Sequence, residues 1–591
     1  MIFGKHINKY YLKYAPLLIF GVLALLLVDF LQLEIPELYR MVLEGIQNKE
    51  VKVGGELVPF DMDFLLNEIC GPLLWIVLAL VFGRFLWRVC LFGAGIQVEK
   101  DIRSEMFSRA KNLSQQYYQR NKVGNMMSLF TNDLETVQEC FGDGVLMFAD
   151  ALLLGSIAII KMMRMNLWLT LLSLVPMMLL LAVSTVVGKA MMKKWEQRQA
   201  AFSALSDFAQ ENFSGIAVIK AFVKELKELL AFRKLNKDNE DANIEFTKVS
   251  TLLHICVTLF VESVICVILG YGGFLVYKGD FSAAQLIEFI SYFSATIWPI
   301  MAVSQLIDMS SRGKASLKRV SELLDSVPDV RDRDDVHDVD HISGDIEFKS
   351  LTFRYPDADY DALADASFKI NAGENVGIIG KTGAGKTTIV DLILRTYNVP
   401  DGTLFIDGHD VNSIPIRTVR KFAAYVPQDN FLFSDTIENN IAFATDGGNT
   451  DDVIKAATLS AVHGNISEFQ DGYATVLGER GVTVSGGQKQ RISIARALMK
   501  DASILILDDS VSAVDTETER VIISNLRENR KGKTTILIAH RISTVEKMDK
   551  IIFVDDGRII AVGSHDELNA TCPEYQTMVE LQKLEEEKEG V

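Results

Sequence analysis

The stretch Gly380-Lys-Thr-Gly-Ala-Gly-Lys386-Thr387 decides the fold of the C-terminal half of the chain. It follows an apolar run at 375–379 and leads into a helix-forming run at 387–395. A glycine-rich turn between a strand and a helix brings backbone N–H groups and the positive end of the helix dipole to one point, where they suit a phosphate group. In this setting the pattern G-x-x-x-x-G-K-[ST] predicts a nucleotide-binding α/β domain.

The polar residues of this loop have distinct expected roles. Lys386 is expected to reach the β- and γ-phosphates of ATP, and the Thr387 hydroxyl is expected to coordinate Mg²⁺. A second apolar run, 503–507, ends at Asp508, whose carboxylate would hold Mg²⁺ through water. The ATP contacts expected from the loop are Gly380, Thr382, Gly383, Gly385, Lys386, Thr387 and Thr388.

Short β-rich runs alternate with helical runs through the rest of this half. They lie at 346–348, 375–379, 422–426, 504–507, 535–538 and 550–554. The alternation predicts an α/β domain with a mainly parallel sheet, which we place at residues 345–591. The stretch before it is rich in aspartate and contains Pro328, so it cannot bury a core and predicts a linker at 321–344.

Residues 1–320 have a different pattern, in which long apolar runs recur. These runs lie at 15–33, 70–96, 145–160, 167–187, 252–277 and 283–307. Because a helix of about 20 residues spans the hydrocarbon of a bilayer, they predict a membrane domain of six transmembrane helices. The polar loops between them contain strong helix formers, so we expect the helices to extend into the cytoplasm. The formal net charge of −17 disfavours a nucleic-acid partner.

Lysine and arginine are unevenly divided between the connections of this domain. They are concentrated at 5–13, 100–122, 189–248 and 312–319, whereas the opposite connections are short or acidic. Since positively charged loops stay on the cytoplasmic side, both termini and the nucleotide-binding domain are expected in the cytoplasm.

The most specific string in the chain is Val484-Ser-Gly-Gly-Gln488, followed by Lys-Gln-Arg-Ile-Ser-Ile-Ala-Arg-Ala-Leu. It resembles the signature of ATP-binding-cassette (ABC) proteins, and the resemblance covers nearly the whole chain. The stretches 124–137 and 315–325 also resemble exporter halves that have six spans per chain. The resemblance therefore implies a half-transporter in the bacterial cytoplasmic membrane.

The resemblance also implies site residues outside the glycine-rich loop. Tyr355 would stack on adenine, Gln428 would contact Mg²⁺ and the attacking water, and His540 would contact the γ-phosphate. Asp515 matches the D-loop aspartate, and 475–481 resembles the short loop that precedes the signature in exporters. In ABC proteins two cassettes close head to tail, so a dimer is implied, and the residues that would touch the partner's ATP are Ser485, Gly486, Gly487 and Gln488.

Asp509 departs from the family pattern. The family usually has glutamate here, the general base for the attacking water. Aspartate is one methylene shorter, and a misplacement of about 1 Å can cost on the order of a hundredfold in rate. We expect the site on this chain's own loop to bind ATP and hydrolyse it slowly. A chain with aspartate at this position and an intact signature resembles one subunit of heterodimeric multidrug exporters, the subunit whose own ATP site is degenerate, that is, hydrolyses ATP slowly. The alternative is a homodimer that tolerates Asp509.

The transported molecule is open at this stage. Export of amphipathic small molecules or peptides is the leading hypothesis, by family resemblance alone. A lipid flippase and an importer on the exporter fold are alternatives. Two other classes compete: a soluble ABC ATPase acting on ribosomes or DNA, which the apolar runs and the acidic charge disfavour, and an ATP-binding channel or regulator.

Five ionisable residues fall within the expected membrane helices: Asp29, Arg84, Arg88, Asp150 and Glu262. Charges at that depth are costly, so they line a polar substrate path or pair across helices. Arg84 and Arg88 are four residues apart and share a helix face, with Asp150 as a possible partner. Phe293, Trp298 and Met301 would suit an apolar cavity, or they pack and face lipid.

Overall fold

The structure, a computed structural model, describes residues 3–589 except 54–55, 446, 448, 479–480 and 482. The chain folds into two compact units. The first, here called the membrane unit, holds Met1–Lys111 and Gly124–Asp325. The second, the cassette unit, holds Ser326–Val591 together with the short segment Asn112–Val123.

Long helices make up the membrane unit. The chief ones are α2 (Ala15–Gln32), α3 (Ile35–Asn48), α5 (Gly71–Ala110), α8 (Leu134–Met165), α9 (Leu167–Ser214), α11 (Glu225–Val267), α12 (Gly273–Lys278) and α13 (Ala283–Asp325), and a hairpin of β1 (Glu50–Val53) and β2 (Glu56–Pro59) follows α3. A helix satisfies its own backbone hydrogen bonds, which is why apolar runs of this length fold as helices in lipid.

In the described part of the chain, five helical segments are long and apolar enough to cross a membrane. They are Ala15–Asn48, Met62–Ala110, Val123–Met165, Glu225–Lys278 and Ala283–Asp325. The sixth expected span begins α9, where the apolar stretch Leu167–Leu180 is shorter. The expected run continues onto residues 181, 184 and 185, whose side chains lie outside the described part. A helical membrane domain is thus confirmed, and five of its six expected spans meet the length for crossing a membrane within the described residues.

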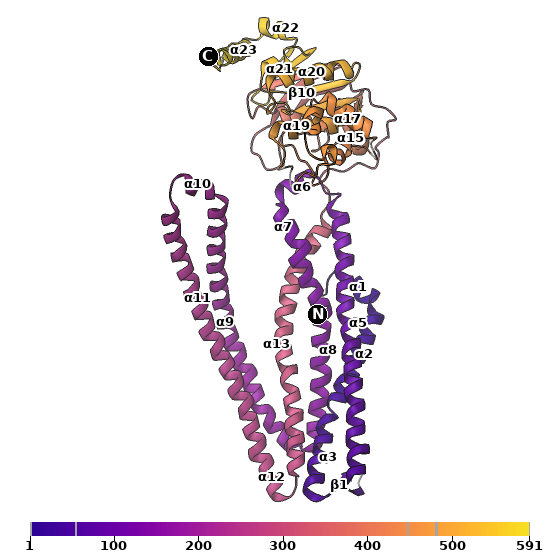
Figure 1. The fold of residues 1–591 in the computed structure, drawn as a ribbon, viewed down its shortest axis with the longest axis vertical. Coiled ribbons are helices and arrows are strands. Elements are labelled where there is room, and N and C mark those ends of the chain that lie inside the picture. Colours follow the sequence, from indigo (N-terminus) through magenta and orange to yellow (C-terminus); the bar gives the residue numbers. More distant parts are fainter. Residues whose placement is uncertain are drawn as a thin grey trace. The chain divides into compact units, whose positions relative to one another are not determined.

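The helices of the membrane unit pack in pairs. α8 runs along α13, and α9 runs along α11 (Figure 1). Small residues allow the first pair to come close: a Cβ at Gly155 of α8 would lie 3.3 Å from Pro299 Cβ of α13. α13 contributes Phe289, Tyr292 and Phe293 to a buried apolar cluster that also takes in side chains of α8, α9 and α11.

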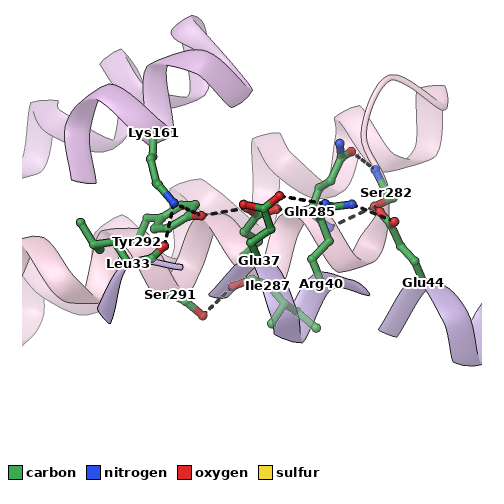
Figure 2. Close-up of polar contacts among 11 residues, drawn as sticks. Leu33, Glu37, Arg40, Glu44, Lys161, Ser282, Gln285, Ile287, Ser291 and Tyr292 are labelled. Carbon is green, nitrogen blue, oxygen red and sulfur yellow. Dashed lines mark hydrogen bonds and ion pairs between the residues drawn. The ribbon is translucent and has the colours of Figure 1, made fainter. Parts of the chain in front are cut away.

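A network of charged side chains joins α3, α8 and α13 at the end of the membrane unit that carries the β1–β2 hairpin (Figures 1 and 2). Lys161 Nζ of α8 donates to Leu33 O at 2.9 Å and to Glu34 Oε1 at 3.0 Å. Arg40 of α3 pairs with Glu44 at 2.9 Å and with the buried Glu288 of α13 at 3.0 Å. Because each buried carboxylate here has a cation beside it, the network ties three helices together instead of leaving charges stranded.

The cassette unit is built on two sheets. The larger has the order β12-β11-β5-β10-β9-β8 and is parallel except for β12. Its strands are β5 (Asn375–Gly380), β8 (Ala423–Val426), β9 (Ile504–Asp508), β10 (Thr534–Ile538), β11 (Lys550–Asp555) and β12 (Arg558–Gly563). The smaller, antiparallel sheet has the order β4-β3-β6-β7: β3 (Ile346–Phe353), β4 (Leu363–Ile370), β6 (Leu404–Ile406) and β7 (His409–Asp410).

Helices pack on the larger sheet, and its central strands are buried and mostly apolar. β9 and β10 are buried at every position, as expected for parallel strands packed on both faces. The helices that position the site are α14 (Lys386–Ile393) and α19 (Gly486–Met499). The expected α/β nucleotide-binding fold is confirmed.

The segment Asn112–Val123 lies against the β3–β4 loop. It contains α6 (Gln115–Arg120), whose last residue forms two hydrogen bonds of 3.1 Å to the Asp357 carboxylate. Beside it, the Tyr397 hydroxyl donates to Gln119 Oε1. A piece of chain that lies in sequence between two membrane helices therefore packs as part of the cassette unit.

Candidate nucleotide-binding site

The glycine-rich loop joins β5 to α14. Gly385 is the N-cap of α14 and has φ +96°, a left-handed conformation that favours glycine. A Cβ at this position would lie 2.5 Å from Ala362 O, so a side chain would also collide with the β3–β4 loop. Two constraints, the left-handed backbone and the close approach of Ala362, therefore require glycine here.

Lys386 is buried at the first position of α14. Its Nζ donates to Gly380 O and to Lys381 O, both at 2.8 Å. Burial lowers the pKa of Lys386, and the nearby carboxylates of Asp508 and Asp509 oppose that shift. The loop thus curls around the ammonium group and holds it against the strand end.

Two adjacent carboxylates stand at the end of β9. Asp508 is 1% exposed and lies beside the Thr387 hydroxyl. Its Oδ2 has no hydrogen-bond partner among the described residues. Burial raises the pKa of Asp508, and the Thr387 hydroxyl counteracts this effect. An orphaned buried carboxylate oxygen next to a hydroxyl is a donor set that fits Mg²⁺, which prefers oxygen ligands.

Asp509 has a rigid backbone. Its φ is +46°, a region in which aspartate is tolerated better than most residues. Its N–H donates to Ile538 O at 3.1 Å, and its carbonyl accepts a 2.9 Å hydrogen bond from Ser512 Oγ. The position of the carboxylate is therefore set by the length of the side chain and not by movement of the main chain.

These residues surround a cavity of about 300 Å³ at the carboxyl ends of β5, β9 and β10. Ligands bind outside the carboxyl ends of parallel strands in α/β sheets. Of the residues expected from the sequence, those that line the cavity are Tyr355, Thr382, Gly383, Gly385, Lys386, Thr387, Thr388, Gln428, Asp508, Asp509 and His540. Gly380 contributes its carbonyl to Lys386.

The structure adds lining residues that the sequence did not single out: Tyr360, Asp361, Ala362, Ile538, Asp556 and Gly557. Most of them come from the β3–β4 loop and the β11–β12 turn. Gly557 donates its N–H to Ala384 O at 3.2 Å and accepts from Ala364 N at 2.8 Å, so it binds both segments together. An Asp-Gly dipeptide signals a turn, but nothing in the sequence places that turn over the glycine-rich loop.

Tyr355 is anchored on one side of this cavity. Its ring meets Phe353 and Tyr397 edge-on, each at 5.1 Å between centroids, and its hydroxyl lies 3.0 Å from Thr388 Oγ1. Burial raises the pKa of Tyr355 to about 12, so the phenol stays neutral. Tyr360, also on the cavity wall, is 71% exposed. The site thus offers one fixed ring and one exposed ring.

The signature residues build the start of α19. Ser485 is the N-cap: its Oγ accepts from Gln488 N at 3.3 Å, and Gln488 Oε1 accepts from Ser485 N at 3.0 Å. A Cβ at Gly487 would lie 2.8 Å from Ala513 O, so glycine allows the close approach of the segment after β9. Asp515 caps the next helix, α20 (Thr516–Asn529), by accepting from Thr518 N at 2.9 Å.

None of the signature residues, nor Asp515, is among the described residues that line the cavity around Lys386. The structure therefore separates the expected site residues into two groups on one chain. In the loop that precedes the signature, 475–481, residues 479 and 480 lie outside the described residues.

Comparison with known proteins shows which family the chain belongs to. The family model of the ABC transporter transmembrane region matches residues 18–300, and that of the ABC transporter domain matches residues 363–512. The chain is 35% identical over 588 residues to the probable multidrug resistance ABC transporter ATP-binding/permease protein YheI of Bacillus subtilis (strain 168), covering 99% of this chain and 98% of that protein. The chain belongs to the ABC transporter family.

Further similarities place this ABC transporter among exporters. It is 32% identical over 536 residues to an ATP-dependent lipid A-core flippase of Syntrophus aciditrophicus (strain SB), covering 89% of this chain and 88% of that protein. The solved structure of a bacterial Atm1-family ABC exporter with ATP bound has a TM-score of 0.76 and 25% identity, and the match covers 98% of each chain. This transporter is thus a multi-pass membrane protein with an exporter fold and a cassette whose ATPase activity drives transport.

Proposed function

We propose that this transporter exports amphipathic small molecules or peptides across the bacterial cytoplasmic membrane as one half of a heterodimer. The observation that carries the proposal is Asp509 at the position of the general base, on a fixed backbone, in a chain whose signature helix is well formed. The name of the Bacillus relative, which describes multidrug resistance, supports the substrate class.

The two groups of site residues explain why a second chain is needed. The start of α19 carries a capping box and the positive end of a 14-residue helix dipole, which suits an anion. That end is separate from the chain's own Lys386 cavity. It would complete the ATP site of a partner chain, and the partner's signature would complete the site at Lys386.

In the site at Lys386, each side chain would have one task. Lys386 would exchange its bonds to Gly380 O and Lys381 O for phosphate oxygens, and Tyr355 would stack on adenine. Thr387, Gln428 and Asp508 would hold Mg²⁺, which supplies charge neutralisation and orientation of the β- and γ-phosphates.

At this site we expect only the hydrolysis of ATP to be slow, and not its binding. Asp509 would accept the proton of the attacking water, and His540 would hold the γ-phosphate. Since the Asp509 main chain is tied to Ile538 and Ser512, its shorter side chain leaves the carboxylate about 1 Å back from the water. ATP would therefore remain at this site through several cycles, while the site formed with the partner's base turns over.

ATP binding would close the two cassettes and drive alternating access of the membrane helices. The segment Asn112–Val123, joined to Asp357 through Arg120, is the part of the cassette unit that follows α5 along the chain and leads, through residues 124–133, to α8. It is therefore placed to carry motion from the nucleotide loop to those helices. The distribution of lysine and arginine would put this segment, both termini and the cassette in the cytoplasm.

The test compares the purified chain alone with the chain co-purified with the product of a neighbouring half-transporter gene. We expect little ATPase activity from the single chain and substantial activity from the pair. Transport of fluorescent amphipathic compounds into inside-out vesicles should likewise require both chains. Robust ATPase activity of the single chain, abolished by Asp509→Asn, would instead establish the homodimer.

Lipid translocation is the second candidate function, because a relative that covers most of the chain is named a lipid A-core flippase. Proteoliposomes containing fluorescent lipids distinguish the two. ATP-dependent flipping without transport of water-soluble amphipathic compounds would favour the flippase, and the converse would favour export.

A further inference from the structure

We propose that Gln582 of the C-terminal helix α23 (Pro573–Glu589) is a positioning residue for His540 in the ATP site around Lys386. The inference rests on the proposed role of His540, which is to hold the γ-phosphate, and it adds a residue that supports this role from outside the cavity. Gln582 follows His540 by 42 residues and is not among the described residues that line the cavity. Its effect on ATP would therefore pass through the loop that carries His540.

Gln582 holds the main chain of that loop at two points. Its Nε2 donates to His540 O at 2.7 Å, and its Oε1 accepts from Ile542 N at 2.8 Å. The loop is short, because β10 ends at Ile538 and α21 (Ile542–Val545) begins four residues later. One side-chain amide thus bridges the main-chain groups on both sides of residue 541. It serves one partner as a donor and the other as an acceptor, which a carboxylate, an acceptor only, cannot do.

The imidazole of His540 has no such support of its own. The side chain is exposed and lines the cavity, and no hydrogen bond or ion pair joins the ring to another residue in the part of the chain that the structure describes. The preceding residue, Ala539, is buried, and its N–H donates to Ile378 O of β5 at 3.2 Å. The ring is therefore aimed by its main chain, which β5 fixes on one side of His540 and Gln582 fixes on the other.

α23 is anchored firmly enough to serve as the fixed partner of the loop. Tyr575 is fully buried, and its ring meets Phe553 of β11 edge-on at 5.7 Å between centroids. Val579 is also buried and belongs to the same apolar cluster as Ala539. Tyr575, Val579 and Gln582 are spaced by four and three residues, so they share one face of the helix. The face that packs on the cassette is therefore the face that brings Gln582 to the loop.

Removing the amide would loosen the loop without unfolding the cassette. The hydrogen bond to His540 O is exposed to solvent and the one to Ile542 N is partly buried, so water can replace both. What is lost is the fixed direction of the imidazole. A hydrogen bond to a charged phosphate strengthens binding by about tenfold or more. Since ADP has no γ-phosphate for His540 to hold, the amide affects the binding of ATP and not that of ADP.

The test measures how strongly the assembled transporter in lipid nanodiscs prefers a nonhydrolysable ATP analogue, adenylyl imidodiphosphate, over ADP. The lysine of the partner chain's glycine-rich loop is replaced by alanine, so that the binding measured is that at Lys386. Gln582→Met keeps the length of the side chain and removes both hydrogen bonds. We expect it to weaken binding of the analogue by about tenfold and to leave the Kd of ADP unchanged.

Gln576→Met is the matched control. Gln576 is an exposed residue of the same helix, and its side chain donates to Glu580 Oε1 at 3.3 Å within that helix. The variant therefore loses a glutamine amide without touching the loop, and it should bind both nucleotides like the wild type. His540→Ala gives the second comparison. Because Gln582 acts through the imidazole, Gln582→Met should add nothing to the effect of His540→Ala. Unchanged melting temperatures would show that the variants are folded.

The outcomes separate this inference from the proposed role of His540. Equal nucleotide preferences for Gln582→Met and Gln576→Met, equal weakening of ADP and analogue binding by Gln582→Met, or additive effects of Gln582→Met and His540→Ala would each refute the positioning role alone. If Gln582→Met does not fold, Gln582→Glu carries the same comparisons, because it keeps the acceptor for Ile542 N and loses the donor for His540 O. If His540→Ala itself leaves the preference for the analogue unchanged, the proposed role of His540 fails, and this inference fails with it.

Discussion

Replacing Asp509 with glutamate restores the side-chain length that the family usually has at the base position. The main chain at this residue is tied to Ile538 O at 3.1 Å and to Ser512 Oγ at 2.9 Å, so the added methylene should move the carboxylate forward by about 1 Å. A correction of that size is expected to raise the rate of hydrolysis at this site by up to about a hundredfold, or about 2.7 kcal/mol in barrier height.

The gain has a separate cost in stability. Asp509 has φ +46°, and glutamate lacks the short polar side chain that makes aspartate tolerable there. We expect Asp509→Glu to lower the stability of the cassette by about 1 kcal/mol, measured as a small decrease in melting temperature. Faster ATP hydrolysis together with a lower melting temperature would indicate that the carboxylate has been repositioned. A cassette that had simply become more rigid would instead show a higher melting temperature.

The assay uses the assembled transporter. The lysine of the partner chain's glycine-rich loop is replaced by alanine, so that only the site at Lys386 hydrolyses ATP. Single-turnover hydrolysis of radiolabelled ATP then reports on residue 509 alone. Asp509→Asn is the control: it has the length of aspartate without a base and should be no faster than the wild type. A rate for Asp509→Glu within about threefold of the wild type would refute the argument from side-chain reach.

Two further substitutions test the packing. Gly487→Ala should destabilise the cassette by about 1–3 kcal/mol, because the new Cβ would lie 2.8 Å from Ala513 O. Gly486→Ala is the control: its Cβ would have its nearest atom at 4.0 Å, so it should lower the melting temperature less. Equal decreases in melting temperature for the two variants would contradict this account. Arg40→Met should leave the buried Glu288 without its 3.0 Å partner and cost about 3–5 kcal/mol. Melting curves of the purified protein measure this loss of stability. The double variant Arg40→Met, Glu288→Gln should be more stable than Arg40→Met alone.

Much of the nucleotide site was predictable because its signals are local. The glycine-rich loop, the carboxylate after an apolar strand and the signature are short strings whose backbone requirements can be recognised without a fold. Parallel strands then bring their carboxyl ends to one edge, which is why Gln428, Asp508 and His540 meet although they lie far apart in the chain.

The residues that pack over the glycine-rich loop could not be predicted from the sequence. Ala362 and Gly557 lie against the loop because two turns from different sheets pack on it, and their own sequences carry only turn signals. Similarly, the sequence suggested Asp150 as a partner for Arg84, whereas the structure pairs Arg84 with Gln32 and Asp150 with Trp298. Which side chains meet between helices depends on the rotation of each helix about its axis, a property of packing.

The sequence by itself determined that this chain has a membrane-spanning helical part and an ATP-binding cassette, and most of the residues that line the cavity at the start of α14, since apolar length and glycine placement act within a few turns of chain. Only the tertiary structure decided that the signature stands apart from its own cavity, that Arg40 and Lys161 neutralise the acids around them, and that Trp298 of α13 donates to Asp150 of α8. Those facts depend on contacts between residues far apart in the chain, which no local pattern encodes.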